Sequence, residues 1–122
     1  MTAKETADKF YASFSQGNAN EMLKLYHPEI EFADPAFGTL KAEKAHAMWR
    51  MLLSSKQAQL KISYTIIDYS DTQVKVNWIA DYYFGPKKRK VKNNVIADLT
   101  FQDGKIIKHT DSFNLWKWSR QA

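Results

Sequence analysis

Three side chains of this 122-residue chain have the types and surroundings for acid–base chemistry: Asp34, His109 and Asp111. Asp34 follows a short, mostly apolar stretch and precedes a proline, which holds the backbone at the aspartate extended. Period-two alternation places it on the same side of a strand at residues 29–33 as Ile30 and Phe32. A carboxylate in apolar surroundings tends to have a raised pKa, which suits proton transfer. We therefore predict that Asp34 points inward and acts as a general base.

His109 and Asp111 lie two residues apart on the last predicted strand, which runs from residue 105 to about 118. Side chains two apart share one face of a strand. The odd positions are flanked by apolar residues and form the expected inward face: Ile107, His109, Asp111, Phe113 and Leu115. An imidazole titrates near neutral pH, and two carboxylates in one pocket have their pKa values pushed apart. We predict that Asp111 is the acid or second carboxylate, and that His109 orients or charges one of the two.

Other interpretations of these residues remain open. An aspartate before a proline is often a turn or cap residue. The pair of His109 and Asp111 could be a hydrogen-bonded core pair, or could face a dimer partner. The three side chains are usable metal ligands, but their spacing does not demand a metal. We expect no metal site and no cofactor.

Several aromatic residues fall on the apolar sides of the predicted elements, where they form either core or the lining of a cavity. Ligand pockets are mostly apolar with a few placed polar groups. The expected ligand-binding aromatic residues are Phe10, Phe14, Trp49, Tyr64, Trp78 and Tyr82. Asn93 is the odd polar residue on the inward side of its strand and needs a partner if buried. Asn93, or Asn94 at a local bulge, is expected to bind the ligand or a catalytic carboxylate.

Helical signals occupy the first half of the chain. Thr2 and Glu5 form a capping box, so a helix should begin at residue 3 and end at Gly17. A second capping signal at Asn18 predicts another helix, which His27-Pro28 should stop. A third helix is predicted at residues 41–55 from its apolar stripe.

The hydrophobic period changes from 3.6 to 2 after residue 60, which predicts four strands. Asp103-Gly104 is a strong hairpin signal, and the strands should form a meander. Strands that are apolar on one side only form a sheet whose apolar face must pack against another layer, and three amphipathic helices can supply that layer. The order ααβαββββ therefore predicts an α+β fold, in which a strongly twisted sheet curls over the helices as a cone with a cavity at its open end.

Composition narrows the class of protein. The length predicts one domain over residues 1–122. There is no cysteine, no apolar run near the ~20 residues of a membrane span, and no signal-peptide pattern at the N-terminus. We expect a cytoplasmic protein without a membrane partner.

The net charge of +5 is concentrated in the run Lys87–Lys90 with Lys92, after the turn signal Gly85-Pro86. We interpret this run as a solvated hairpin tip. Binding to nucleic acid or another anionic surface is the alternative. Nucleic acid is disfavoured because the aromatic residues follow the apolar side of the strands instead of interleaving with the basic residues.

The whole chain resembles the ketosteroid-isomerase-like, SnoaL-like branch of the nuclear transport factor 2 superfamily. The resemblance rests on the phenylalanine-rich first helix and on five motifs: Gly17-Asn18, Leu25-Tyr26-His27-Pro28, Phe32-Ala33-Asp34-Pro35, Ala47-Met48-Trp49-Arg50-Met51-Leu52, and the ending from Asp103 to Phe113. It implies a cone-shaped α+β barrel, a small hydrophobic ligand, and a homodimer formed through the outer face of the sheet.

The resemblance also assigns roles. The general base of ketosteroid isomerases falls at Asp34, but their oxyanion-binding tyrosine and aspartate fall at Phe10 and Ala97, which cannot donate a hydrogen bond. The neighbouring Tyr11 and Asp98 are expected to face away. Losing one oxyanion donor can cost 10²–10³ in rate, so steroid isomerisation itself is disfavoured.

Two other activities of the fold fit less directly. Epoxide hydrolases of this fold use an Asp-Arg-Asp set, for which Arg50 is a poor match. SnoaL-like cyclases use acid–base residues on the later strands, which His109 and Asp111 match only in type. Our leading hypothesis is a pocket protein for a small hydrophobic molecule that catalyses a cofactor-free isomerisation, cyclisation or hydration. The alternative is a non-catalytic binding or dimeric assembly module.

Overall fold

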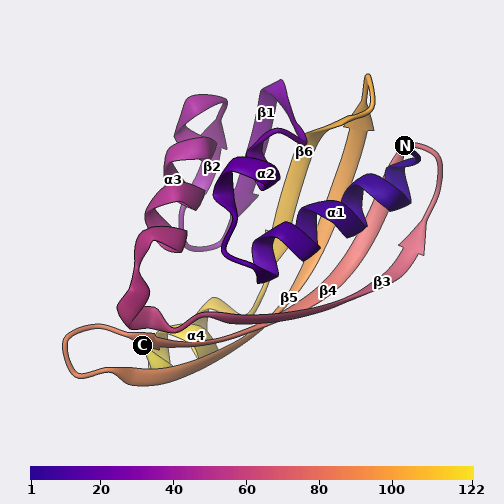
Figure 1. Cartoon of the computed structure of the whole chain (residues 1–122). Helices are drawn as coiled ribbons and strands as arrows, with labels where there is room; N and C mark the ends of the chain where they lie inside the picture. The colour runs from indigo at the N-terminus through magenta and orange to yellow at the C-terminus, as the bar shows by residue number, and fades with distance from the viewer.

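The chain forms helices and strands in the order ααββαββββα, with one short 3₁₀ turn (Figure 1). The computed structural model describes residues 1–122, apart from the side chain of Gln57. The helical segments are α1 (Ala3–Ser15), α2 (Ala19–Leu23), α3 (Glu43–Ser54), η1 (Lys56–Ala58) and α4 (Leu115–Gln121). The strands are β1 (Tyr26–Asp34), β2 (Gly38–Lys41), β3 (Lys61–Tyr69), β4 (Gln73–Phe84), β5 (Arg89–Gln102) and β6 (Lys105–Ser112).

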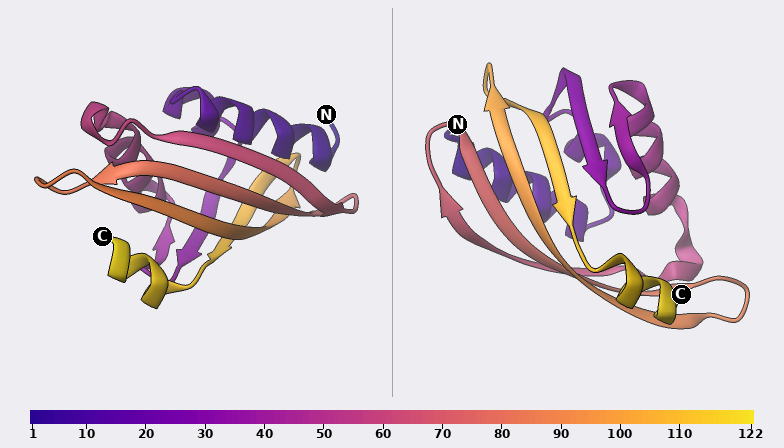
Figure 2. Two further views of the ribbon diagram at one scale, coloured as in Figure 1. Left: turned by 90° about the horizontal axis from the view of Figure 1, so that it is seen from below. Right: turned by 180° about the vertical axis from the view of Figure 1, so that it is seen from behind.

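All six strands belong to one curved, unclosed sheet in the order β2-β1-β6-β5-β4-β3. The last four strands form the predicted antiparallel meander. β1 pairs with β6 in parallel, so β6 lies between the early strands and the meander. The α+β class and the cone-like curvature predicted from the sequence are confirmed (Figure 2).

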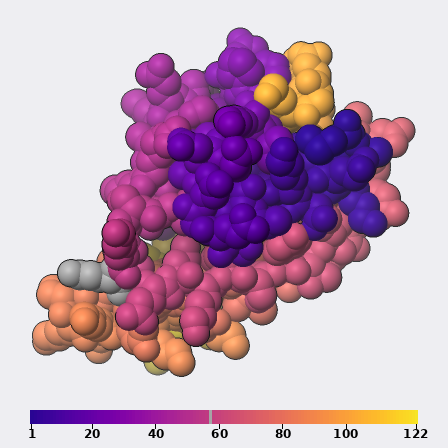
Figure 3. Space-filling model, viewed as in Figure 1, coloured from indigo at the N-terminus to yellow at the C-terminus, as the bar shows by residue number. Residues whose placement is uncertain are grey.

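The N-terminal helices cover the concave face of this sheet, and the core lies between the two layers (Figure 3). Alternate residues of β4 are buried, from Val74 to Ala80, and alternate residues of β5 from Val91 to Phe101. Across from them, α1 buries Phe10, Tyr11 and Phe14. The buried faces of the strands, which repeat every two residues, therefore pack against the buried face of the helix, which repeats every 3.6 residues, in one apolar layer.

The first helix begins where its capping box predicts. Thr2 Oγ1 accepts the Glu5 backbone N–H at 3.1 Å, and Glu5 Oε1 accepts the Thr2 N–H at 3.0 Å. Gly17 follows the end of α1 with a left-handed φ of 69°. Asn18 caps α2 through the Glu21 N–H at 3.2 Å. The third helix is also confirmed, within two residues of its predicted ends.

Two predicted element ends were wrong, and one short strand was not predicted. The second helix ends at Leu23, before His27-Pro28, because Tyr26 already pairs with Ile106 as the first residue of β1. The short strand β2 was not predicted. The last strand ends at Ser112 and does not reach Trp118, because Asn114 Oδ1 accepts the Lys117 N–H at 3.0 Å and starts α4.

The inward face of β6 was predicted correctly at His109 and Asp111 but not throughout. Ile106 is buried, whereas Ile107, predicted to point inward, is only partly so. The cause is a bulge in β6: Thr100 and Phe101 of β5 pair with Lys108 and Ile106, which leaves Ile107 as the extra, unpaired residue. Phe113 packs partly against the core, and Leu115 is exposed at the start of α4.

The turn at Asp103-Gly104 sets the register of β5 against β6. Both residues have positive φ, 54° and 74°, as a two-residue hairpin requires. The resulting register places His109 opposite Leu99, and Asp111 opposite Ala97. None of the helices in the described part of the chain is long and apolar enough to cross a bilayer.

We expect Gly104→Ala to lower the free energy of unfolding by about 1 kcal/mol, measured by urea denaturation. A Cβ at this position would meet no atom within 4 Å, so the loss would come from the left-handed backbone alone. The exposed neighbour Gln102→Ala is the control and should change stability by less than about 0.5 kcal/mol. Equal stability of the two variants would contradict this account of the turn.

Candidate functional site

The centre of the candidate site is a buried hydrogen bond between His109 and Asp111. His109 Nε2 lies 2.8 Å from Asp111 Oδ1, and the two side chains are 0% and 3% exposed. Both lie on the inward face of β6, where residues two apart are neighbours. Of the interpretations left open by the sequence, a surface facing a dimer partner is therefore wrong for this pair.

Tyr26 and Trp49 determine which nitrogen of His109 carries the proton. The Trp49 Nε1–H donates to Tyr26 Oη at 2.9 Å, and Tyr26 Oη lies 2.7 Å from His109 Nδ1. An indole N–H can only donate, so the Tyr26 hydroxyl accepts from Trp49 and turns its own hydrogen toward His109. Nδ1 then accepts, and neutral His109 carries its hydrogen on Nε2, facing Asp111.

Asp111 Oδ1 also accepts a second, longer hydrogen bond from Trp78 Nε1 at 3.3 Å. Aromatic rings surround the imidazole on the remaining sides. The centroid of the His109 ring lies 4.9 Å from that of Phe32 and 5.7 Å from that of Phe10, both in edge-on arrangements. The pair is thus held by two tryptophans and one tyrosine within an aromatic shell.

Tyr11 has a fully buried hydroxyl without a hydrogen-bond partner among the described residues. Burial raises the pKa of Tyr11 well above its usual value, and the charge of Asp111 raises it further. The expectation that Tyr11 faces away was wrong, because neighbouring positions on a helix differ by only about 100° and the buried side of α1 includes both Phe10 and Tyr11. Asp98, in contrast, is exposed as expected.

Ala97 has no polar group, but Asp111 lies directly opposite it across the β5–β6 ladder. A carboxyl group therefore reaches this part of the interior from the neighbouring strand. Matching a sequence motif position by position could not show that Asp111 lies opposite Ala97, because that placement depends on the register between two strands and not on spacing along the chain.

Asp34 ends β1 and is only partly buried. Its Oδ1 accepts the Phe37 backbone N–H at 2.5 Å, so the residue does cap the turn after the strand. Partial burial raises the pKa of Asp34, the negative charge of Asp111 adds to this rise, and the Phe37 N–H opposes it. The three predicted acid–base residues thus interact electrostatically, although no hydrogen bond joins Asp34 to the other two among the described contacts.

The predicted ligand-binding residues divide into two groups. Phe10, Phe14, Trp49 and Trp78 are buried around the His109–Asp111 pair or one ring away from it. Tyr64 and Tyr82 are only partly buried, and Tyr82 Oη accepts from Trp118 Nε1 at 2.5 Å. Asn93 is partly buried, while Asn94 is exposed and bonds to Asn77 at 2.6 Å.

Tyr64 is bound to the first helix, because its hydroxyl donates to Asp8 Oδ1 at 2.6 Å. Burial and this carboxylate raise the pKa of Tyr64 to about 12. Tyr64 and Asp8 therefore link β3 to α1 at the edge of the core.

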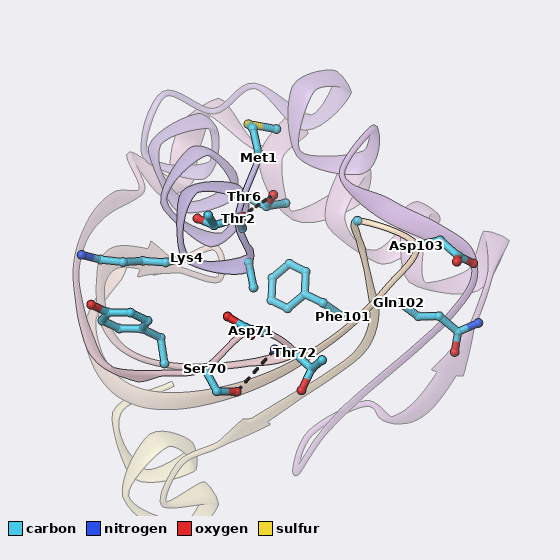
Figure 4. Close-up of a pocket in the computed structure, with 13 residues that line it drawn as sticks. Met1, Thr2, Lys4, Thr6, Ser70, Asp71, Thr72, Phe101, Gln102 and Asp103 are labelled. Carbon is cyan, nitrogen blue, oxygen red and sulfur yellow. Dashed lines mark hydrogen bonds between the residues drawn. The ribbon is translucent and has the colours of Figure 1, made fainter.

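Two surface clefts lie elsewhere. One of about 590 Å³ lies between the N-terminus of α1 and the turns after β3 and β5, with Phe101 pointing into it (Figure 4). A second of about 400 Å³ runs over the adjoining ends of β3, β4 and β5. Neither is lined by Asp34, His109 or Asp111. Within the part of the chain that the structure describes, no group of three possible metal ligands occurs.

Tyr26→Phe should lower the free energy of unfolding by about 1–3 kcal/mol, because it leaves the Trp49 N–H without an acceptor and His109 Nδ1 without a donor. Chemical denaturation measures the loss, and Tyr69→Phe at an exposed position is the matched control. Nitrogen NMR of histidine should show hydrogen on Nε2 of His109 in the unmodified protein. Hydrogen on Nδ1 would contradict the proposed direction of these bonds.

Asp34→Asn should become progressively more stable relative to the unmodified protein as pH rises from 3 to neutrality. The pKa of Asp34 is raised on folding, so the unfolded state loses this proton first and ionisation at higher pH favours unfolding. Asparagine lacks this penalty and can still accept the Phe37 N–H. Denaturation at several pH values tests this, and a stability difference that does not change with pH would show that the pKa is not raised.

Comparison with known proteins agrees with this fold. The family model described as "SnoaL-like domain" matches residues 7–109. No curated protein matches the chain in sequence. A candidate polyketide cyclase from Xanthomonas campestris pv. campestris has a similar structure, with a TM-score of 0.81 and 17% identity over 98% of this chain and 95% of that one.

Two further solved structures are similar over most of their lengths. A candidate isomerase from Bacillus subtilis has a TM-score of 0.79 and 17% identity over 98% of this chain and 91% of that one. An LEH-like epoxide hydrolase from M. tuberculosis has a TM-score of 0.74 and 12% identity over 96% and 86%. At these identities the similarity shows the fold alone. Because the family model covers most of the chain, the protein belongs to the SnoaL-like family.

Proposed function

We propose that this protein is a cofactor-free acid–base enzyme that transfers a proton on a small, largely apolar molecule. The observation that carries the proposal is the buried His109–Asp111 pair together with a partly exposed Asp34 whose pKa the same carboxylate helps to raise. Clusters of ionisable groups with perturbed pKa values are typical of active sites.

A purely structural role explains the pair less well. Taking two ionisable groups out of water is expensive, and well-packed apolar side chains of similar volume often give equal or greater stability. Here the pair lies among buried aromatic rings that could fill the space alone. Retaining an imidazole and a carboxylate at the centre of such a core supports a chemical use.

The geometry assigns different roles to the three residues. Asp34 is the accessible carboxylate, and its raised pKa suits it to take a proton from a bound molecule. His109 holds Asp111 through Nε2, which leaves Asp111 Oδ2 as the second acid–base atom of the site. The unpartnered Tyr11 hydroxyl adds a donor that can bind an oxygen on which negative charge develops.

Similar structures support this class of chemistry. Their names include a candidate polyketide cyclase, a candidate isomerase and an epoxide hydrolase. Isomerisation, cyclisation and hydration share the need for a placed acid and base. The proposal for this chain therefore names proton transfer and leaves the particular substrate to experiment.

Non-catalytic binding is the second candidate, and one observation favours it. Neither of the two clefts described above includes Asp34, His109 or Asp111, and buried aromatic side chains surround the pair. A chain that only holds a ligand or assembles with a second copy would need no open acid–base pocket. Homodimerisation, cytoplasmic location and the extent of the domain stay predictions from the sequence.

A screen of small cyclic ketones, aromatic acids and epoxides, read by thermal shift and by turnover, tests the proposal. For any substrate found, Asp34→Asn should lower kcat by roughly 10²–10⁴-fold and leave binding largely intact, because it removes only the proton acceptor. Asp111→Asn should also lower kcat. The exposed Asp68→Asn is the control and should retain the full rate.

Two results would argue against catalysis by these residues. Full rates in both Asp34→Asn and Asp111→Asn would remove them from the mechanism. Ligands that stabilise the protein and its Asp34→Asn variant equally, with no turnover of any of them, would favour the binding module.

A further inference from the structure

The positive charge of this protein is concentrated at one end of the molecule. Residues 82–92 and 112–122 contain seven of the 18 Lys and Arg residues and none of the 13 Asp and Glu residues. The rest of the chain contains the other 11 basic residues and all 13 acidic ones, so its net charge is −2. The net charge of the whole chain is +5. We call these two segments together the basic end.

The two segments of the basic end are in contact. The Lys92 backbone N–H donates to Gln121 Oε1 at 2.9 Å, and α4 packs against β5. The ring of Trp118 lies 5.9 Å from that of Phe84, edge-on. The charges of α4, at Lys117 and Arg120, therefore add to those of the hairpin between β4 and β5.

Exposed apolar side chains interleave with these charges. Trp116 is 74% exposed, and Phe84 45%. Across the hairpin, Tyr83 pairs with Lys90 and Phe84 with Arg89, and such partners lie on the same face of the ribbon. From the sequence, the aromatic residues were expected on the apolar side of the strands. Phe84 follows that pattern, whereas Tyr83 lies on the opposite side of β4, beside Lys90.

The basic end is convex. Its hairpin projects beyond the layer of helices, with α4 beside it (Figures 1 and 2). In the space-filling view the hairpin between β4 and β5, in orange, forms a lobe at the lower left (Figure 3). A projecting tip can touch a flat surface with several side chains at once, but it has no groove to follow a strand of nucleic acid.

We propose that the basic end binds peripherally to anionic phospholipid surfaces. Its seven cations would contact lipid phosphates and carboxylates, while Trp116, Leu115 and Phe84 would enter the headgroup layer. Tryptophan and tyrosine favour this interface because one end of each side chain is apolar and the other polar. This revises the sequence expectation of no membrane partner.

A second copy of the chain is a poorer partner for the same surface. Two basic ends facing each other would bring seven positive charges against seven, with no acidic residue of either segment to neutralise them. Charge complementarity therefore favours an anionic partner. The seven cations and the exposed Trp116 and Leu115 together favour a lipid surface over a purely polar polyanion.

Co-sedimentation with vesicles tests the proposal. The protein should bind vesicles containing about one third phosphatidylserine and should not bind vesicles of phosphatidylcholine alone. Binding should weaken as salt rises, because each cation near the surface adds to an electrostatic attraction that salt screens. The tryptophan emission should shift to shorter wavelength on binding, and Trp116→Ala should reduce that shift.

Changing Lys87, Lys88, Arg89 and Lys90 together to glutamine should weaken vesicle binding by at least about 50-fold. The matched control changes four exposed lysines elsewhere, Lys9, Lys41, Lys44 and Lys108, to glutamine and should bind nearly as well as the unmodified protein. Thermal unfolding of both variants checks that they fold.

Three outcomes would overturn the proposal. The first is equal binding to neutral and anionic vesicles, and the second is equal loss of binding in the two lysine variants. The third is a preference for another partner: tighter binding to a thymidine oligonucleotide than to anionic vesicles, or a dimer that Trp116→Ala dissociates while no vesicle binding is seen.

Discussion

The hydrogen bond between His109 and Asp111 is the constraint around which the interior is arranged. An imidazole and a carboxylate can be buried only if their remaining polar atoms also find partners. Tyr26 from β1 bonds His109 Nδ1 and is itself held by Trp49 from α3, while Trp78 from β4 donates to Asp111 Oδ1. The helix α3, the strand β1 and the antiparallel meander therefore all contribute to the hydrogen bonds around His109 and Asp111. The aromatic rings around the two side chains exclude water.

The position of β6 in the sheet makes this convergence possible. β6 pairs with β1 on one side and with β5 on the other, so a side chain on its inward face is close to both. The Asp103-Gly104 turn sets the register on one side, and the parallel pairing of Phe32 with His109 sets it on the other. A displacement of one residue in either ladder would turn His109 and Asp111 to the outer face.

Local patterns predicted what local forces determine. The capping box at Thr2, the alternation along β4 and β5, and the inward direction of His109 and Asp111 depend on neighbours in sequence, and all were predicted correctly. Tyr26 was assigned to a helix because it follows Met22 and Leu23 by four and three residues, which is helical spacing. Its role as partner of His109, and the inward direction of Tyr11, depend on contacts between distant segments. The charge of the basic end was visible in sequence, but its contact with α4 was not.

The two indoles at the ends of the buried polar chain limit how a proton can travel. Trp49 and Trp78 can only donate, so the bonds run from Trp49 through Tyr26 and His109 to Asp111, where Trp78 meets them from the other side. A proton wire works by reversing every bond along its length, and an indole N–H cannot reverse. All the donors of this chain therefore point toward Asp111, and no proton can pass along it from one indole to the other.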